Sequence, residues 1–306
     1  MKVIFLGTPE FAIAPLKALL SSRHEVLAVV SQPDRAKDRK GRLLATPVKA
    51  FAEQNGVPVF QFEKIRESGV EKLKELKSDI MVTAAYGQIL SKEILEIAPH
   101  GVINVHASVL PKLRGSAPVQ WAVINGDKET GVTIMQTDVG VDNGDILAVK
   151  RTPIGKGETS GELLARLSEM GAQLLMETLD KIERGTAEAK PQDESKATKC
   201  RMLTKADGHL DFGEAKDKIV NRCLGVTPAP GAYAVMNGET VKIGRVRAVD
   251  GDFGECGVTR VVGGEIVVGC ADGGVVIERL QLPGAKMLTA REFLNGRHFE
   301  GGVKLS

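Results

Sequence analysis

The chain lacks the cysteine patterns that mark metal sites or disulfide frameworks. Its four cysteines show no Cys-x-x-Cys spacing and do not cluster with histidine: Cys200, Cys223, Cys256 and Cys270. This spacing favours reduced, buried thiols over zinc ligands or disulfides. We therefore expect no structural metal.

The chain also has no long apolar run. No stretch approaches the ~20 apolar residues of a membrane-spanning helix. The apolar residues 3–6 are too few for a signal peptide and lead directly into Gly7-Thr8-Pro9, so they indicate a first strand. These absences predict a cytoplasmic protein.

A third absence concerns glycine after that first strand. A dinucleotide-binding turn needs three glycines at fixed spacing, and only Gly7 is present. An NAD(P)-dependent oxidoreductase is therefore disfavoured.

Charge of one sign is also lacking: the net charge is +2, and residues 208–306 carry twelve acids and twelve bases. Any nucleic-acid contact by that region has to come from one basic face.

The patterns that are present predict two domains. At 306 residues the chain exceeds the usual single-domain length. Strand and helix patterns alternate over residues 1–147, which predicts a mostly parallel, doubly wound, Rossmann-like α/β sheet. The expected strands are 2–6, 25–31, 57–60, 79–84, 102–105 and 132–137, and the expected helices are 14–22, 46–55, 69–77, 92–97 (capped by Ser91) and 117–125.

A capping box, Thr159 to Glu162, begins a long helix that Gly185 ends. Beyond a polar stretch, short strands prevail, with an Asn237-Gly238 hairpin signal and strands at 258–262, 265–270 and 275–280. These strands predict a small β-barrel of the oligonucleotide-binding (OB) kind. The expected domains are a catalytic domain over 1–189, a linker over 190–206 and a β-barrel domain over 207–306.

Three polar residues form the candidate catalytic site. Asn104 and His106 end a buried strand two residues apart, so they project to the same face. Asp142 lies in a glycine-punctuated loop after the strand 132–137, where a carboxylate can face them. An amide, an imidazole and a carboxylate at one end of a sheet suit acyl chemistry at neutral pH.

The Asn104-Val105-His106 motif, the loop from Ser108 to Gly115 and the Asp142 loop together resemble the formyltransferases that use 10-formyltetrahydrofolate. The resemblance covers essentially the whole chain and is closest to the branch that formylates methionyl-tRNA. It implies transfer of a formyl group to the amino group of initiator methionyl-tRNA. It implies Asn104, His106 and Asp142 as catalytic residues, and folate contacts from Gly87, Gln88, Ile89 and Leu90 and from Ser108, Val109, Leu110 and Pro111.

Two departures from the family pattern stand out. Val109 occupies a position where the family usually has Leu, a small apolar change that leaves folate binding intact. The segment 226–232 lacks the Trp that the family commonly carries there, so a contact assigned to that Trp is in doubt, and the chemistry is not.

A basic segment completes the candidate site. Between Arg35 and Arg42 there are five cations and one acid, which indicates either a solvated loop or a flexible arm that contacts tRNA phosphates. The candidate tRNA-binding residues are Arg35, Lys37, Arg39, Lys40 and Arg42.

The main alternative is a formyltransferase acting on an amino-sugar nucleotide, since the catalytic residues do not identify the acceptor. A glycinamide ribonucleotide formyltransferase resembles only the first domain, and a non-catalytic RNA-binding protein leaves the catalytic motif unexplained. We expect a monomer.

Overall fold

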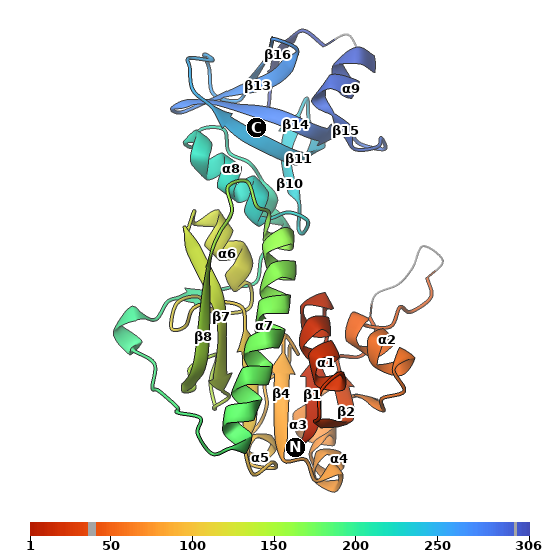
Figure 1. The fold of residues 1–306 in the computed structure, drawn as a ribbon. Coiled ribbons are helices and arrows are strands. Elements are labelled where there is room, and N and C mark those ends of the chain that lie inside the picture. Colours follow the sequence, from red (N-terminus) through yellow and green to blue (C-terminus); the bar gives the residue numbers. More distant parts are fainter. Residues whose placement is uncertain (36–40, 297–298) are drawn as a thin grey trace. The chain divides into compact units, whose positions relative to one another are not determined.

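The computed structural model describes residues 1–35, 41–296 and 299–306, and these divide into two compact units (Figure 1). The first unit comprises residues 1–115, 130–152 and 164–199. The second comprises residues 116–129, 153–163 and 200–306. It thus includes two segments from within the stretch 1–189 that the sequence analysis assigned to the catalytic domain.

The first unit is built on a seven-stranded sheet in the order β3-β2-β1-β4-β5-β7-β8. The five strands from β3 to β5 are parallel, and β7 is antiparallel to β5. The mostly parallel α/β sheet is therefore confirmed. The strands are β1 (Lys2–Gly7), β2 (Glu25–Ser31), β3 (Val59–Gln61), β4 (Ile80–Ala84), β5 (Val102–His106), β7 (Glu129–Gln136) and β8 (Ile146–Pro153).

Helices cover both faces of this sheet. On one face, Ile4 and Leu6 of β1 pack with buried residues of α3, α4 and α5. On the other face, a Cβ added to Gly171 of α7 would lie 2.8 Å from Val105, so α7 packs tightly on β5. The helices of this unit are α1 (Ile13–Leu20), α2 (Pro47–Gln54), α3 (Ile65–Ser68), α4 (Val70–Leu76), α5 (Lys92–Leu95) and α7 (Ser160–Glu183), whose first residues belong to the second unit.

The predicted helix starts have mixed outcomes. The capping box at α7 is present, because Thr159 N donates to Glu162 at 2.8 Å and Glu162 N donates to Thr159 Oγ1 at 3.3 Å. Ser91 occupies the N-cap position of α5, but its hydroxyl makes no capping hydrogen bond. The prediction that Ser91 caps this helix is wrong, and α5 ends at Leu95 rather than at Ile97.

The second unit contains a six-stranded antiparallel path in the order β10-β11-β14-β13-β12-β16. Its two ends meet, because Met236 of β10 bridges Leu305, and Val235 and Ser306 exchange backbone hydrogen bonds of 2.6 and 2.9 Å. The β-barrel prediction is confirmed. The strands are β10 (Ala232–Met236), β11 (Glu239–Val249), β12 (Val258–Val262), β13 (Glu265–Cys270), β14 (Gly273–Gln281), β15 (Leu288–Thr289) and β16 (Gly301–Lys304).

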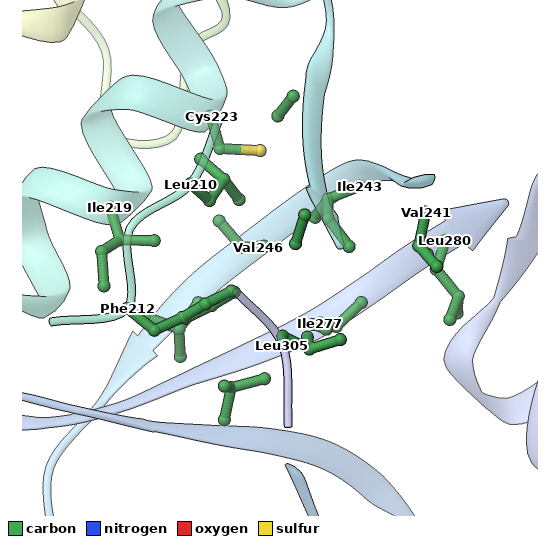
Figure 2. Packing of buried hydrophobic residues seen from close by; sticks show 14 of the residues in the cluster. Leu210, Phe212, Ile219, Cys223, Val241, Ile243, Val246, Ile277, Leu280 and Leu305 are labelled. Carbon is green, nitrogen blue, oxygen red and sulfur yellow. The ribbon is translucent and has the colours of Figure 1, made fainter. Parts of the chain in front are cut away.

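The core of the second unit lies between this sheet and α8 (Lys216–Gly225), a helix that the sequence analysis missed. Figure 2 shows Ile219 and Cys223 of α8 directed toward Val246 and Ile277 of the strands. Burial raises the pKa of the Cys223 thiol to about 12, and all four cysteines are free thiols. The unit's other helices are α6 (Pro118–Ile124) and α9 (Ala290–Gly296).

The Asn237-Gly238 turn between β10 and β11 is confirmed, with φ of 52° and 80° at its two residues, as a tight hairpin requires. The predicted linker region holds only short elements: the 3₁₀ turns Glu194–Lys196 and Lys205–Gly208, and β9 (Lys199–Cys200). Most residues of 190–199 nevertheless make side-chain or backbone hydrogen bonds within the first unit. One of them joins Thr198 O to Arg114 N, on β6 (Arg114–Gly115), at 2.9 Å.

Candidate active site

Asn104 and His106 lie on β5, two residues apart, on the sheet face that also carries Val102. β5 is an interior strand, with β4 on one side and β7 on the other. Strand pairing therefore fixes the backbone of both residues, and their position in the sheet does not depend on side-chain contacts.

The amide of Asn104 has a defined orientation. Its Oδ1 accepts a 2.9 Å hydrogen bond from the hydroxyl of Thr83, a buried residue of β4. Since the oxygen is occupied by this donor, the NH₂ group faces the other way, with Nδ2 3.4 Å from Asp142 Oδ1. Asn104 thus presents a donor to the site.

The imidazole of His106 is only 6% exposed and lies between two acceptors. Nε2 is 3.2 Å from the carbonyl oxygen of Leu113, and Nδ1 is 3.6 Å from Asp142 Oδ2. A carbonyl oxygen can only accept, so Nε2 carries a proton. The Asp142 carboxylate near Nδ1 lies slightly beyond hydrogen-bond distance of the ring.

Asp142 completes the triad from the loop between β7 and β8. Its φ is 51°, in the left-handed region that non-glycine residues seldom adopt. Its Oδ2 accepts a 2.8 Å hydrogen bond from Gly115 N, while Oδ1 faces Asn104. The prediction that a carboxylate of this loop faces Asn104 and His106 is confirmed.

The loop does not reach the site in the way that a strand parallel to β5 would bring it there. β7 is antiparallel to β5, with Ile103 opposite Gln136 and His106 opposite Thr133, so β7 ends at the amino end of β5. The loop after β7 therefore does not start at the edge where Asn104 and His106 lie. It folds back instead, and Gln136 N donates to Asp145 O at 2.8 Å where the loop closes.

The loop from Ser108 to Pro111 is held firmly by its own interactions. Ser108 is 1% exposed and donates to Lys112 O at 2.7 Å, while Leu110 is buried. Thr133 of β7 connects the two, since its hydroxyl donates to Ser108 O and accepts from Leu110 N. These contacts fix the loop's path, and the assignment of Ser108, Val109, Leu110 and Pro111 to folate remains a prediction.

The segment 87–90 combines an exposed apolar side chain with buried neighbours. Ile89 is 73% exposed, whereas Leu90 is buried in the core. Gln88 holds the loop, donating to Phe62 O at 2.8 Å and accepting from Ile65 N at 2.8 Å. Gly87 has a φ of 88°.

The basic segment is only partly described. Lys37, Arg39 and Lys40 lie outside the described residues. Arg35 and Arg42 are exposed, and Arg35 pairs with Glu63 at 3.1 Å.

The residues on either side of this segment are joined by hydrogen bonds. Asp34 accepts from Lys49 Nζ at 2.6 Å and from Thr46 N at 3.2 Å. Burial raises the pKa of the Asp34 carboxyl, but the hydrogen bonds from Lys49, Gln61 and Thr46 outweigh it, so the pKa lies below its ordinary value. A charged carboxylate, that of Asp34 just before the basic segment, therefore binds Thr46 and Lys49 just after it.

Three contributors to the site escaped sequence reasoning. Thr83 orients Asn104, and its only signal was its place at the end of a predicted strand. Arg114 falls within the quoted loop but was given no role. Gln192 lies in the predicted linker and contacts the Asp142 loop; no local pattern marks it.

Within the described ranges, no three His, Cys, Asp or Glu side chains come together as a metal site. Nor does any helix in those ranges have the length and apolar character to cross a membrane.

Comparison with known families gives a match over most of the chain. Residues 1–179 match the family described as "Formyl transferase", and residues 202–298 match "Formyl transferase, C-terminal domain". The chain is 46% identical over 310 residues to the methionyl-tRNA formyltransferase of Alkaliphilus metalliredigens, covering 100% of this chain and 98% of that protein. It is 44% identical over 307 residues to that of Geobacter metallireducens, with the same coverage.

Solved structures share the fold at low identity. One is an N-formyltransferase from Helicobacter canadensis in complex with folinic acid and dTDP-3-aminofucose, with a TM-score of 0.71 and 19% identity over 94% of this chain and 100% of that chain. Another is HypX from Aquifex aeolicus in complex with tetrahydrofolic acid, with a TM-score of 0.64 and 18% identity over 96% of this chain and 47% of that one.

Proposed function

Since the chain belongs to the formyl transferase family, we propose that it transfers the formyl group of 10-formyltetrahydrofolate to the amino group of initiator methionyl-tRNA. The observation that carries this choice of acceptor is the 44–46% identity, over the full chain, to proteins named as methionyl-tRNA formyltransferases. Such a reaction belongs to the cytoplasm, where charged tRNA is found.

The triad geometry supports the chemistry. The acceptor amine attacks the formyl carbon, a C–N bond forms, and the carbonyl oxygen acquires negative charge in the tetrahedral intermediate. The Asn104 NH₂ group, oriented by Thr83, has a second proton besides the one directed at Asp142 and can donate it to this oxyanion; an N–H of His106 can do so once substrate replaces its contact with Leu113 O. The C–N10 bond then breaks and N10 takes a proton, which restores tetrahydrofolate.

Asp142 has two roles in this proposal. Its carboxylate lies 3.6 Å from His106 Nδ1, where it helps to orient the ring. It is also positioned to accept, directly or through a water, the proton that the attacking amine loses. No serine, cysteine or lysine nucleophile is needed, because the nucleophile is the amine of the acceptor.

The folate is assigned to the loops 87–90 and 108–111. Ile89 supports this assignment, because a 73% exposed apolar side chain on a loop that Gln88 and Leu90 hold in place offers a surface for a flat ring. The rigid loop from Ser108 to Pro111 would form a second wall. The folate supplies the activated formyl group; the chain supplies the donors and the base.

The basic segment 35–42, with five cations and one acid, favours a large, phosphate-rich acceptor. An amino-sugar nucleotide is the second candidate, because a relative solved with dTDP-3-aminofucose shares the fold. Its 19% identity, against 46% to a full-length tRNA-acting relative, makes tRNA the better supported acceptor. We assign residues 1–189 to catalysis and 207–306 to tRNA binding, in a monomer.

The deciding experiment is a formyl-transfer assay with 10-formyltetrahydrofolate, comparing methionyl-tRNA with dTDP-linked amino sugars at equal concentration. We expect formylmethionyl-tRNA as the main product. Turnover on the sugar nucleotide alone would overturn the proposed acceptor while leaving the triad's role intact.

The basic segment has its own test. If its cations meet phosphates, the affinity for methionyl-tRNA falls with salt by ~0.7–0.9 log units per contact per log unit of salt. Changing Arg39, Lys40 and Arg42 together to Ala is expected to raise the KM for tRNA and flatten this dependence. An unchanged KM and slope would show that the segment is merely solvated.

A further inference from the structure

A buried arginine and a glutamine connect the predicted linker to the Asp142 loop. Arg114 is 5% exposed. Its Nε and Nη2 donate to Gln192 Oε1 at 3.0 and 2.8 Å. The amide NH₂ of Gln192 donates in turn to the backbone oxygens of Asp142 and Gly144, at 2.9 and 2.7 Å.

The chemistry of the two side chains sets the direction of this network. A guanidinium has donors only, so the Gln192 oxygen has to face Arg114 and its nitrogen has to face the loop. Every polar atom of the Gln192 amide is thereby satisfied. On its far side, Arg114 forms a two-point ion pair with Glu194 at 2.7 and 3.0 Å. Hydrogen bonding to Arg114 holds the pKa of the Glu194 carboxyl below its ordinary value.

The Asp142 loop needs such external contacts. Val139, Gly140 and Val141 are exposed, and Asp142 adopts the unfavourable left-handed conformation. Strained residues of this kind persist where the surroundings hold them. Gln192 binds the carbonyls at residue 142 and two residues further on, and the carboxylate is one carbon away from the backbone. Fixing those carbonyls fixes the backbone from which the carboxylate reaches the site, and the Gly115 N–H then holds the carboxylate itself.

We propose that Gln192 and Arg114 are positioning residues, which hold the Asp142 carboxylate at its working distance from Asn104 and His106. This inference rests on the proposed function, in which Asp142 acts on the reacting amine. It places a determinant of turnover in the segment 190–199, which the sequence presents only as a polar connection.

The main test is Gln192→Ala. We expect kcat for methionyl-tRNA to fall by roughly 10²-fold, since a displacement of about 1 Å at a reacting group has that effect. The KM for 10-formyltetrahydrofolate should stay unchanged. Gln192→Glu keeps an acceptor for Arg114 but places an oxygen against the two loop carbonyls, and should lose at least as much. Ser195→Ala is the matched control: an exposed side chain in the same segment, bonded to Asp193 and not to the loop.

A double-mutant cycle separates positioning from a direct contact with tRNA. If Gln192 acts through Asp142, adding Gln192→Ala to Asp142→Ala lowers kcat by less than about twofold further, because neighbours that act through each other are not additive. A full further loss in that background would overturn the proposal. So would wild-type kcat in Gln192→Ala.

A readout independent of activity keeps this test distinct from that of the proposed function. Amide hydrogen exchange over residues 137–145 should be faster in Gln192→Ala and unchanged in Ser195→Ala. Arg114→Lys should give the same pattern, because an ammonium group cannot bind the glutamine oxygen through two fixed donors. Unchanged exchange in Gln192→Ala would refute the network whatever the wild-type protein formylates.

Discussion

The site combines residues from two regions of the molecule, and their positions are fixed in different ways. Asn104 and His106 sit on β5, an interior strand whose neighbours on both sides define where each residue lies. Asp142 sits on an exposed loop and depends on hydrogen bonds from Gly115 and Gln192. The strand residues are placed by the fold of the first unit, whereas the loop residue is placed by a few specific contacts. Perturbing the strand should therefore affect stability, and perturbing the loop should affect turnover.

The largest expected effect removes the side chains themselves. Asn104→Ala, His106→Ala and Asp142→Ala should each lower kcat by ~10²–10³-fold, as expected for loss of a group that stabilises the transition state. Folate affinity should change little, because these contacts strengthen only in the transition state. Steady-state kinetics with a folate titration measure both, and near-normal turnover in all three variants would refute the site.

Next in size is a change in the loop backbone. Gly140 has a φ of 144°, and a Cβ there would lie 2.7 Å from Asn143 Oδ1. We expect Gly140→Ala to lower kcat about tenfold or more by displacing Asp142, with the melting temperature within a few degrees of wild type. A large loss of stability with normal kcat would contradict the comparison.

A smaller effect on turnover is expected from Thr83→Val, which removes the hydroxyl that orients Asn104 with little change in shape. The hydroxyl also donates to Ile103 O of β5 at 3.2 Å, but the strand pairing of β5 remains, so we expect a several-fold loss of kcat, less than that of Gln192→Ala. The ranking is measured with both variants in one assay. A greater loss for Thr83→Val would mean that amide orientation matters more than loop position.

A change in the packing of α7 against β5 is expected to lower stability and to leave turnover nearly unchanged. A Cβ on Gly171 would lie 2.8 Å from Val105, and such overpacking usually costs ~1–3 kcal/mol. We expect Gly171→Ala to lower the melting temperature by several degrees, with kcat at a permissive temperature close to normal. Thermal unfolding and kinetics on the same sample test this.

The smallest effect on turnover should come from Asp207, a carboxylate of the second unit. Its hydrogen bonds from Arg201 hold its pKa well below the ordinary value of 3.8, despite burial. The contribution of Asp207 to the free energy of unfolding is thus complete above about pH 4, where the carboxyl is charged in both states, and is lost as the pH falls below that. Asp207→Asn should lower stability at neutral pH without changing kcat, and its unfolding should lose part of the wild type's acid sensitivity. Emission of Trp121, the chain's single tryptophan, whose Nε1 donates to Arg201 O at 2.8 Å, reports on this cluster.

The sequence was informative where the physics is local. Apolar runs such as 25–31 and 265–270 coincide with the observed strands, and the capping box at Thr159 and the Asn-Gly hairpin both form. β8 was missed because an edge strand, half-exposed along its length and carrying Lys150 and Arg151, has no continuous apolar run. α8 was missed because it is short, and its four apolar side chains stand among charged and polar ones: Ile219, Val220, Cys223 and Leu224.

The same distinction between local and long-range interactions decides which site residues could be predicted. Asn104 and His106 could be predicted from period-two alternation and from a recognisable motif. The direction of β7 could not, because antiparallel pairing beside a parallel sheet leaves no local signal. Gln192 could not be found either: its role depends on contacts with residues some fifty and eighty positions away.

The closure of the second unit's barrel by Leu305 and Ser306 has a consequence for biosynthesis. Met236 and Leu305 are joined late, since β10 leaves the ribosome well before its partner is made. Until residues 301–306 arrive, β10 and β12 each present an open edge, and unpaired edges invite association with other chains. A nascent chain stalled before residue 301 should therefore be the aggregation-prone form.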